Sequence, residues 1–289
     1  MTRIAFTKVQ GTGNDFILID GRVQRAEWRA LAPRLCDRHF GIGADGLLIV
    51  EASQRAAIRM QIINADGSEA EMCGNGLRCF AKWAVEHGGL SLANGGVEIE
   101  TGAGVLQATF PGWMPGAGPI QRVRLSMGRP HLAPAEIPVV AEGPGPIKEL
   151  PLSVDNRTLP VTCVSMGNPH AVHFTRTPVA EVDLARLGPL VEGNARFPQH
   201  TNFEIVNVES RTHLRARVWE RGVGMTLACG TGAAATLVAA RLHGLVEERA
   251  TVSLPGGDLE LAWDGAGPVF LEGPAAYVFE GVWSDDGHA

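Results

Sequence analysis

The chain has 289 residues, of which 45% are hydrophobic and 19% charged, and its formal net charge is −6. This length suits about two domains of ordinary size, and the acidic balance argues against a nucleic-acid-binding protein. No run reaches the roughly 18 apolar residues of a membrane helix, and the start, MTRIAFTKVQ, lacks the apolar region of a signal peptide.

Apolar alternation, broken by Gly-rich turns, predicts strands at 17–19, 47–50, 58–63, 97–110 and 121–127. Between the first two strands, residues 23–39 are predicted to form a surface helix with Trp28, Leu31 and Leu35 on one side. The Pro- and Gly-rich stretch 111–119 predicts a loop. The pattern mixes strands with few helices, which indicates an α/β protein.

A short stretch occurs twice, as CGNGLRCFAKWAVEHG at 73–88 and as CGTGAAATLVAARLHG at 229–244. Each copy opens with Cys-Gly-x-Gly and continues as a predicted buried helix that ends at Gly88 or Gly244. Cys73 and Cys229 are therefore expected at helix N-termini. There the free amide N–H groups and the helix dipole favour a thiolate.

Other landmarks repeat at nearly the same distance. GND at 13–15 matches GNP at 167–169 with a shift of 154, and the two cysteines are 156 apart. Gly46-Leu47-Leu48-Ile49 falls on Asn202-Phe203-Glu204-Ile205, also with a shift of 156. A repeat of this length indicates two homologous domains related by a pseudo-twofold axis, each a curved sheet wrapped around its single buried helix.

Two such helix N-termini, if they face each other, form an anion site with thiols on both sides. Backbone N–H groups for a carboxylate are available at Gly74, Asn75, Gly230 and Thr231. A thiolate can remove the α-proton of a bound amino acid while the opposite thiol donates a proton to the other face. The N–H groups would stabilise the charge that develops on the carboxylate. This arrangement predicts inversion at carbon by acid–base catalysis.

The remaining cysteines, Cys36, Cys79 and Cys163, are interpreted as small buried apolar residues. Five cysteines at this low density do not make a disulfide scaffold. Reduced thiols and a cytoplasmic protein are therefore expected.

Longer motifs resemble the diaminopimelate epimerase family of cofactor-independent amino-acid racemases and epimerases over essentially the whole chain. They are KVQGTGNDFILID (8–20), RHFGIGADGLLIV (38–50), NADGSEAEMCGNGLRC (64–79), MGNPHAVHF (166–174), HTNFEIV (200–206) and VWERGVGMTLACGTGA (218–233). The resemblance implies two α/β domains with the site between them, no cofactor, a homodimer, and conversion of LL- to meso-diaminopimelate in lysine and peptidoglycan-precursor synthesis. It also implies domains at 1–125 and 126–273, with 274–289 returning to the first.

The resemblance further implies residue roles. Cys73 and Cys229 match the two catalytic bases, and Glu220 matches the acceptor for the reacting ammonium. Positions that match the pocket for the distal end of the substrate are Asn14, Asn64, Asn168, Asn202 and Arg221. His170 either orders the site or packs beside it. Two departures from the family pattern are Gly46, where several members have Gln, and Met225, where many have Glu.

Several alternatives stay open. A racemase of another amino acid on the same fold would keep both cysteines but not the Asn and Arg set, and phenazine-related isomerases share the fold without the paired thiols. A dithiol redox protein is a remote alternative, because the pair is not C-x-x-C. A metal site has little support, since His170 and His173 lie on opposite faces of a strand. Pyridoxal phosphate lacks a suitably placed lysine, and a pure binding protein would not need paired thiols.

Overall fold

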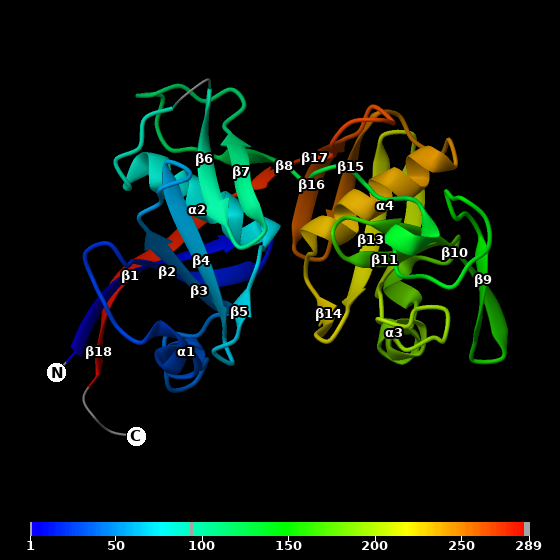
Figure 1. Cartoon of the computed structure of the whole chain (residues 1–289), viewed down its shortest axis with the longest axis horizontal. Helices are drawn as coiled ribbons and strands as arrows, with labels where there is room; N and C mark the ends of the chain where they lie inside the picture. The colour runs from blue at the N-terminus through cyan, green and yellow to red at the C-terminus, as the bar shows by residue number, and fades with distance from the viewer. Residues whose placement is uncertain (1, 93–94, 286–289) are drawn as a thin grey trace. The chain divides into compact units, whose positions relative to one another are not determined.

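The computed structural model describes residues 2–92 and 95–285 (Figure 1). The chain divides into two compact units, which we call unit 1 (up to Leu125, and from Gly273 on) and unit 2 (Ser126–Glu272). Each unit is a mixed sheet with one central helix, so the predicted fold class is confirmed. None of the helices in the described ranges is long and apolar enough to cross a membrane.

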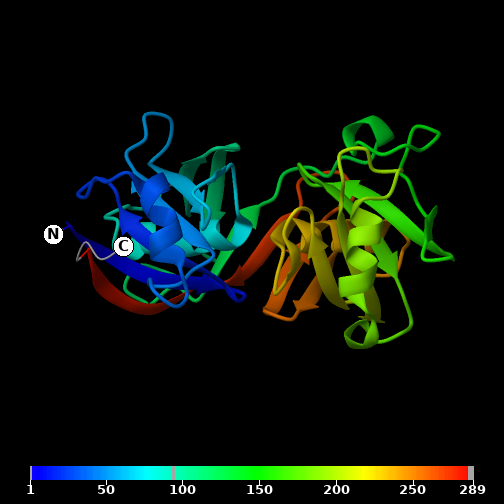
Figure 2. The same cartoon turned by 90° about the horizontal axis from the view of Figure 1, so that it is seen from below.

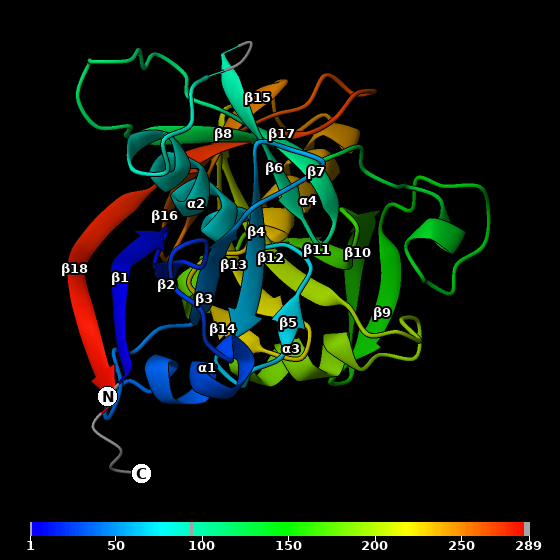
Figure 3. The same ribbon diagram turned by 60° about the vertical axis from the view of Figure 1, so that its left-hand side comes forward.

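In unit 1 the strands follow the spatial order β18-β1-β2-β3-β4-β6-β7-β8. The pairs β2–β3 and β4–β6 are parallel and the others antiparallel, while the short β5 pairs with β4. The elements are β1 (Thr2–Gly11), β2 (Asn14–Asp20), α1 (Trp28–Cys36), β3 (Gly46–Glu51), β4 (Ile58–Asn64), β5 (Glu69–Ala70), α2 (Gly74–Glu86), β6 (Gly96–Thr101), β7 (Gly104–Thr109), β8 (Arg122–Ser126) and β18 (Ala276–Asp285). The last strand, β18, lies beside β1 (Figure 3).

Unit 2 repeats this order as β9-β10-β11-β12-β13-β15-β16-β17, with β14 on β13 and parallel pairs at β11–β12 and β13–β15. Its elements are η1 (Pro134–Glu136), β9 (Leu150–Val154), β10 (Arg157–Ser165), β11 (Pro169–Phe174), η2 (Val179–Glu181), α3 (Leu184–Glu192), β12 (Asn202–Ser210), β13 (His213–Glu220), β14 (Gly224–Thr226), α4 (Gly230–Leu242), β15 (Arg249–Leu254), β16 (Gly257–Ala262) and β17 (Phe270–Pro274).

The register of the two sheets agrees residue by residue. Phe16 of β2 pairs with Gly46 of β3, and His170 of β11 pairs with Asn202 of β12. These pairs correspond at the shifts of 154 and 156 that the sequence shows. The structure therefore shows which residues occupy equivalent positions in the two units.

The central helices α2 and α4 lie against the strands of their own units (Figure 1). The shorter α1 contacts β3 and β4, and α3 contacts β12 and β13 (Figure 2). In α4 the small residues from Ala233 to Ala235 are fully buried, because Ala lets the helix approach strands on several sides. In α2, by contrast, the charged residues Arg78 and Lys82 are buried too.

Apart from the predicted strand at 97–110, which forms the antiparallel pair β6 and β7, local predictions differ from the structure in two helices. The predicted helix at 23–39 is shorter, since the backbone after β2 makes a turn in which Val23 and Gln24 donate to the carbonyl of Asp20. At the other end, the Asp37 carboxylate accepts from the N–H groups of His39 and Phe40 and stops the helix. The second difference is at the end of α2, where Gly89 and not Gly88 has a positive φ, of 76°. Gly244, after α4, has a φ of 68°, as a left-handed cap requires.

Candidate functional site

Each copy of the repeated Cys-Gly-x-Gly motif places its cysteine at the N-cap of a central helix. Cys73 caps α2 and its Sγ accepts from the N–H of Gly76 at 3.5 Å. Cys229 caps α4 and its Sγ accepts from the N–H of Gly232 at 3.4 Å. The predicted position of both thiols at helix N-termini is thus confirmed.

A tight turn delivers an asparagine to each cysteine. Gly13 in the β1–β2 turn has a φ of 83°, and Gly167 in the β10–β11 turn has a φ of 95°. Residues with a side chain rarely adopt such angles, so glycine is needed at both turns. The following residues, Asn14 and Asn168, then point toward the helix N-terminus of their own unit.

In unit 1, the side chains of Asn14, Cys73 and Asn75 form a cluster that we call the unit 1 cluster. The Cys73 Sγ lies 3.4 Å from Oδ1 of Asn14, which also accepts from Nδ2 of Asn75 at 3.4 Å. The other end of the Asn14 amide donates to Asp45 at 2.6 Å, which fixes the orientation of the amide. Asn64 is not brought into this cluster by a hydrogen bond, because its Nδ2 donates to Ser68 of the same turn.

The unit 1 cluster is supported by a buried arginine that was not among the predicted site residues. Arg78 is fully buried and donates to the Oδ1 of Asn75 at 3.0 Å and to Oγ1 of Thr12 at 3.1 Å. It also donates to the carbonyls of Gly74 and Pro274. Burial lowers the pKa of the Arg78 guanidinium from its ordinary value. In the sequence, its burial was indicated only by the position of Arg78 within a predicted buried helix.

In unit 2, the side chains of Asn168, His170, Cys229 and Thr231 form a cluster that we call the unit 2 cluster. Nδ2 of Asn168 donates to Oγ1 of Thr231 at 3.3 Å, and this hydroxyl lies 3.4 Å from Sγ of Cys229. His170 lies behind Asn168, with its Nε2 3.0 Å from Oδ1. The structure therefore brings His170 into hydrogen-bond contact with the cluster.

A buried glutamate, which the sequence analysis did not single out, extends this cluster. Oε1 of Glu204 lies 2.7 Å from Nδ1 of His170, and both side chains are completely buried. A charged residue among the apolar residues of HTNFEIV could have indicated it. Burial raises the pKa of the Glu204 carboxyl, and the nearby His170 lowers it less.

The remaining predicted residues of unit 2 lie at the ends of β12 and β13. Asn202 is 3% exposed and binds backbone on both sides, donating to the carbonyl of Pro169 at 2.8 Å and accepting from the N–H of Arg221 at 2.9 Å. Asn202 thereby fixes the backbone at the start of the turn that contains Arg221. The Arg221 guanidinium is exposed and donates to the carbonyl of Gln199, while Glu220 accepts from the hydroxyl of Thr226.

The electrostatics of Cys229 differ from the expectation for a helix N-terminus alone. Burial first, and then the carboxylate of Glu220, raise the pKa of the Cys229 thiol well above its ordinary value. Hydrogen bonds from Thr231 and from the N–H of Gly232 act in the opposite direction. The protonated thiol is therefore the favoured form, which is the form that donates a proton.

The structure shows what surrounds Gly46 and Met225, the two departures from the family pattern. A Cβ added to Gly46 would lie 2.7 Å from the carbonyl oxygen of Ile63, so β3 and β4 approach too closely there for a side chain. Met225 is 50% exposed, and its sulfur lies 3.4 Å from the Arg217 guanidinium. Neither residue contacts a cysteine through a described hydrogen bond.

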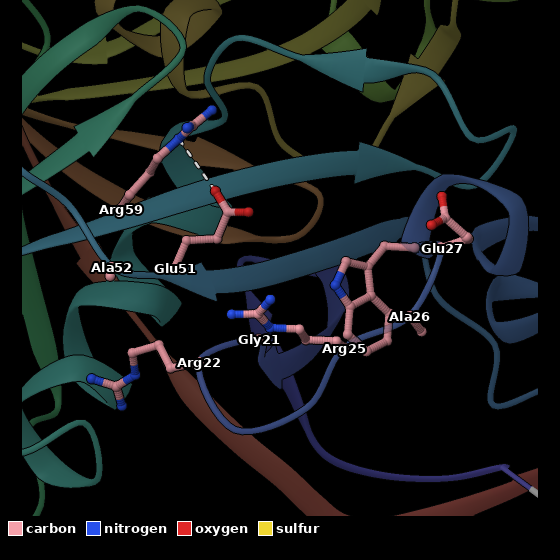
Figure 4. Close-up of a pocket in the computed structure, with 9 residues that line it drawn as sticks. Gly21, Arg22, Arg25, Ala26, Glu27, Glu51, Ala52 and Arg59 are labelled. Carbon is pink, nitrogen blue, oxygen red and sulfur yellow. Dashed lines mark ion pairs between the residues drawn. The ribbon is translucent and has the colours of Figure 1, made fainter.

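A hollow on unit 1, with a volume of about 810 Å³, contains none of the predicted site residues (Figure 4). Its charged lining is largely paired, since Arg59 lies 3.3 Å from Glu51 and Arg22 lies 2.8 Å from Asp20. Within the described ranges, no three His, Cys, Asp or Glu side chains are grouped so that they could hold a metal ion. Predicted site residues gather instead in the unit 1 cluster and the unit 2 cluster.

Comparison with known proteins places this arrangement in a family. The family model described as diaminopimelate epimerase matches residues 6–131 and 162–278. A diaminopimelate epimerase of a Cyanothece species is 47% identical over 288 residues, covering 96% of this chain and 99% of the relative. The diaminopimelate epimerase of Moorella thermoacetica is 45% identical over 280 residues, covering 96% and 98%.

More distant solved structures share the fold. A phenazine biosynthesis protein of the PhzF family from Bacillus anthracis superposes with a TM-score of 0.70 at 16% identity, covering 98% of this chain and 100% of that one. A hydroxyproline epimerase from Agrobacterium vitis, with bound trans-4-hydroxy-L-proline, superposes with a TM-score of 0.69 at 14% identity, covering 97% and 92%. At this identity the likeness concerns the fold alone. With the family model and full-length relatives above 40% identity in agreement, the chain belongs to the diaminopimelate epimerase family.

Proposed function

We propose that this protein is a cofactor-independent isomerase that interconverts LL- and meso-diaminopimelate, in lysine and peptidoglycan-precursor biosynthesis. The observation that carries the proposal is the pair of cysteines at equivalent helix N-termini in two units of the same topology. Relatives of nearly the same length that carry the name diaminopimelate epimerase support the choice of substrate.

Inversion at one carbon requires a base on one face and an acid on the other, and the proposal gives these roles to Cys73 and Cys229. The backbone N–H groups at the two helix N-termini would bind the reacting carboxylate and stabilise its developing charge. They belong to Gly74, Asn75, Gly230 and Thr231. Glu220, at the end of β13, would accept the reacting ammonium.

The distal end of the substrate carries a second ammonium and a second carboxylate, which need acceptors and donors. Amide side chains supply both, and a guanidinium grips a carboxylate bidentately. The proposed set is Asn14, Asn64, Asn168, Asn202 and Arg221. The Asn202 amide would act partly through Arg221, because it holds the backbone N–H of that residue.

Solvent isotope exchange tests the proposal directly. Reduced protein, without any added cofactor, is incubated with LL-diaminopimelate in deuterated water, and configuration and deuterium are followed at both α-carbons. We expect conversion to the meso form with deuterium at the inverted carbon only. No exchange from folded protein with free thiols would contradict the substrate, and exchange with another α-amino acid would favour the racemase alternative. A dithiol redox protein would instead change its thiol count on turnover.

We further propose that the protein is cytoplasmic and homodimeric. None of the five cysteines forms a disulfide, which suits a reducing compartment. On β18, the apolar side chains of Val278, Phe279 and Val282 are 55%, 48% and 51% exposed. A second copy of the same strand offers a self-complementary apolar face, as twofold interfaces require.

Introducing charge on this strand is expected to break the dimer. The double variant Val278→Lys/Val282→Lys should sediment as a monomer in analytical ultracentrifugation, while wild-type protein sediments as a dimer. Val23→Lys, at a position that is 78% exposed on unit 1, is the control and should leave the dimer intact. A monomeric wild-type protein, or a dimeric double variant, would refute this interface.

A further inference from the structure

A continuous chain of side chains runs through unit 2, from the middle of β12 to the N-terminus of α4. Glu204 contacts Nδ1 of His170 at 2.7 Å, and Nε2 of His170 contacts Oδ1 of Asn168 at 3.0 Å. Nδ2 of Asn168 then donates to Thr231 at 3.3 Å, and Thr231 lies 3.4 Å from Sγ of Cys229. Three side chains, those of His170, Asn168 and Thr231, thus link the buried carboxyl group of Glu204 to Cys229.

In this series of hydrogen-bonded side chains, every donor is directed toward the Cys229 sulfur. Because Nδ2 of Asn168 donates to Thr231, the Oδ1 atom faces His170, so Nε2 of His170 carries a proton. The Thr231 oxygen accepts from Asn168, which leaves its own hydrogen free to point at Sγ. A thiolate at Cys229 would therefore receive a hydrogen bond that the whole chain orients.

At the other end of this series of side chains, Glu204 determines which nitrogen of the His170 ring carries a proton. Its Oε2 is buried and has no hydrogen-bond partner in the described structure, so a carboxylate charge there would be poorly satisfied. A protonated carboxyl that donates from Oε1 to Nδ1 leaves only a carbonyl oxygen unpaired. In this arrangement, which agrees with the raised pKa of the Glu204 carboxyl, Nδ1 of His170 accepts a hydrogen bond and Nε2 donates one.

The equivalent positions of unit 1 show that the fold does not need this pair. By register and repeat, His170 stands at the place of Phe16 and Glu204 at the place of Leu48. Both unit 1 residues are buried and apolar. A Cβ added to Gly76 of α2 would meet Leu48 at 3.1 Å, and one added to Gly232 of α4 would meet Oε1 of Glu204 at 2.8 Å. The helix therefore packs on an apolar pair in one unit and on a polar pair in the other.

We propose that Glu204 is a positioning residue for Cys229: it holds the His170 ring so that Asn168 and Thr231 direct a hydrogen bond at the sulfur. The inference rests on the proposed function, in which Cys229 alternates between thiol and thiolate. Its consequence is that loss of Glu204 makes the Cys229 thiolate harder to form.

A simple electrostatic role predicts the opposite sign. The charged or titratable groups that face Cys229 are Glu220, on β13, and Glu204 with its partner His170. If Glu204 acted only as a negative charge near the sulfur, its removal would lower the pKa of the Cys229 thiol. If it acts as a positioning residue, its removal raises that pKa. The direction of the change separates the two roles.

The experiment measures the pH dependence of Cys229 alkylation in the full-length chain, in a Cys73→Ser background. Iodoacetamide labelling of Cys229 is followed by peptide mass spectrometry in Glu204→Leu and Glu204→Gln variants. We expect Glu204→Leu to slow labelling at pH 8 by about tenfold and to shift the profile to higher pH. Glu204→Gln should retain the profile of the background protein, because its amide N–H can donate to Nδ1 as the neutral carboxyl does.

Two further variants complete the test. His170→Phe/Glu204→Leu reproduces the apolar pair of unit 1 and should fold, so it replaces Glu204→Leu if that variant is unfolded; it should show the same upward shift. Glu209→Gln removes an exposed carboxylate from the same strand and should leave the profile unchanged. An unchanged or downward-shifted profile in the Leu variants, or no rescue by Gln, would overturn the proposal. Because labelling needs no substrate, failure of isotope exchange in the wild-type protein would refute the proposed reaction without affecting this result.

Discussion

Replacing Cys73 or Cys229 with alanine is expected to lower the rate of epimerisation by about 10³-fold or more, because each variant lacks the acid or the base on one face of the carbon. The fold should remain, since each Sγ accepts only a long hydrogen bond, of 3.5 or 3.4 Å, from the helix that it caps. Stereochemical conversion and deuterium incorporation measure the loss, and circular dichroism checks the fold.

The other cysteines provide the control. Cys36 is buried on α1, where burial raises the pKa of its thiol to about 11, so it is a poor acid–base group at neutral pH. Cys36→Ala should therefore keep nearly the full rate. If Cys73→Ala or Cys229→Ala turned over at close to the wild-type rate, the assignment of two thiols to the reaction would be wrong.

Replacing Arg78 with alanine is expected to destabilise unit 1 by about 3 kcal/mol. The side chain is fully buried, and its removal leaves a cavity and takes donors from Thr12, Asn75 and the carbonyl of Pro274. Native-state hydrogen exchange of the α2 amides measures the loss. Isotope exchange should also fall, by about 10²-fold, because Arg78 orients Asn75 at the helix N-terminus.

An exposed arginine is the matched control for this change. Arg55 pairs with Glu100 across the surface, and its side chain is 66% exposed. Arg55→Ala should change the free energy of unfolding by less than about 1 kcal/mol. Equal hydrogen-exchange protection in Arg78→Ala and Arg55→Ala would show that the buried guanidinium has no structural role.

Much of the fold could be predicted because it depends on local patterns. Strand alternation located β2, β3 and β4, and the repeated Cys-Gly-x-Gly motif located the N-termini of α2 and α4. The ends of the helices were less predictable, because hydrogen bonds in the adjoining turns decide where a helix begins and ends. A turn on the Asp20 carbonyl takes up the first part of the predicted helix, and the Asp37 carboxylate ends α1; no periodicity reports such contacts.

The residues of the candidate site were likewise predictable only in part from the sequence. The sequence by itself determined the two thiols, their helix caps and the asparagines that follow Gly13 and Gly167, since each depends on residues that are close in the chain. Only the tertiary structure decided that Arg78 and Glu204 are buried, that Asn202 holds the Arg221 backbone, and that His170 joins Glu204 to Asn168. The physical reason is that a polar side chain can be buried only where partners from other strands satisfy it, and those partners become neighbours only when the sheet forms.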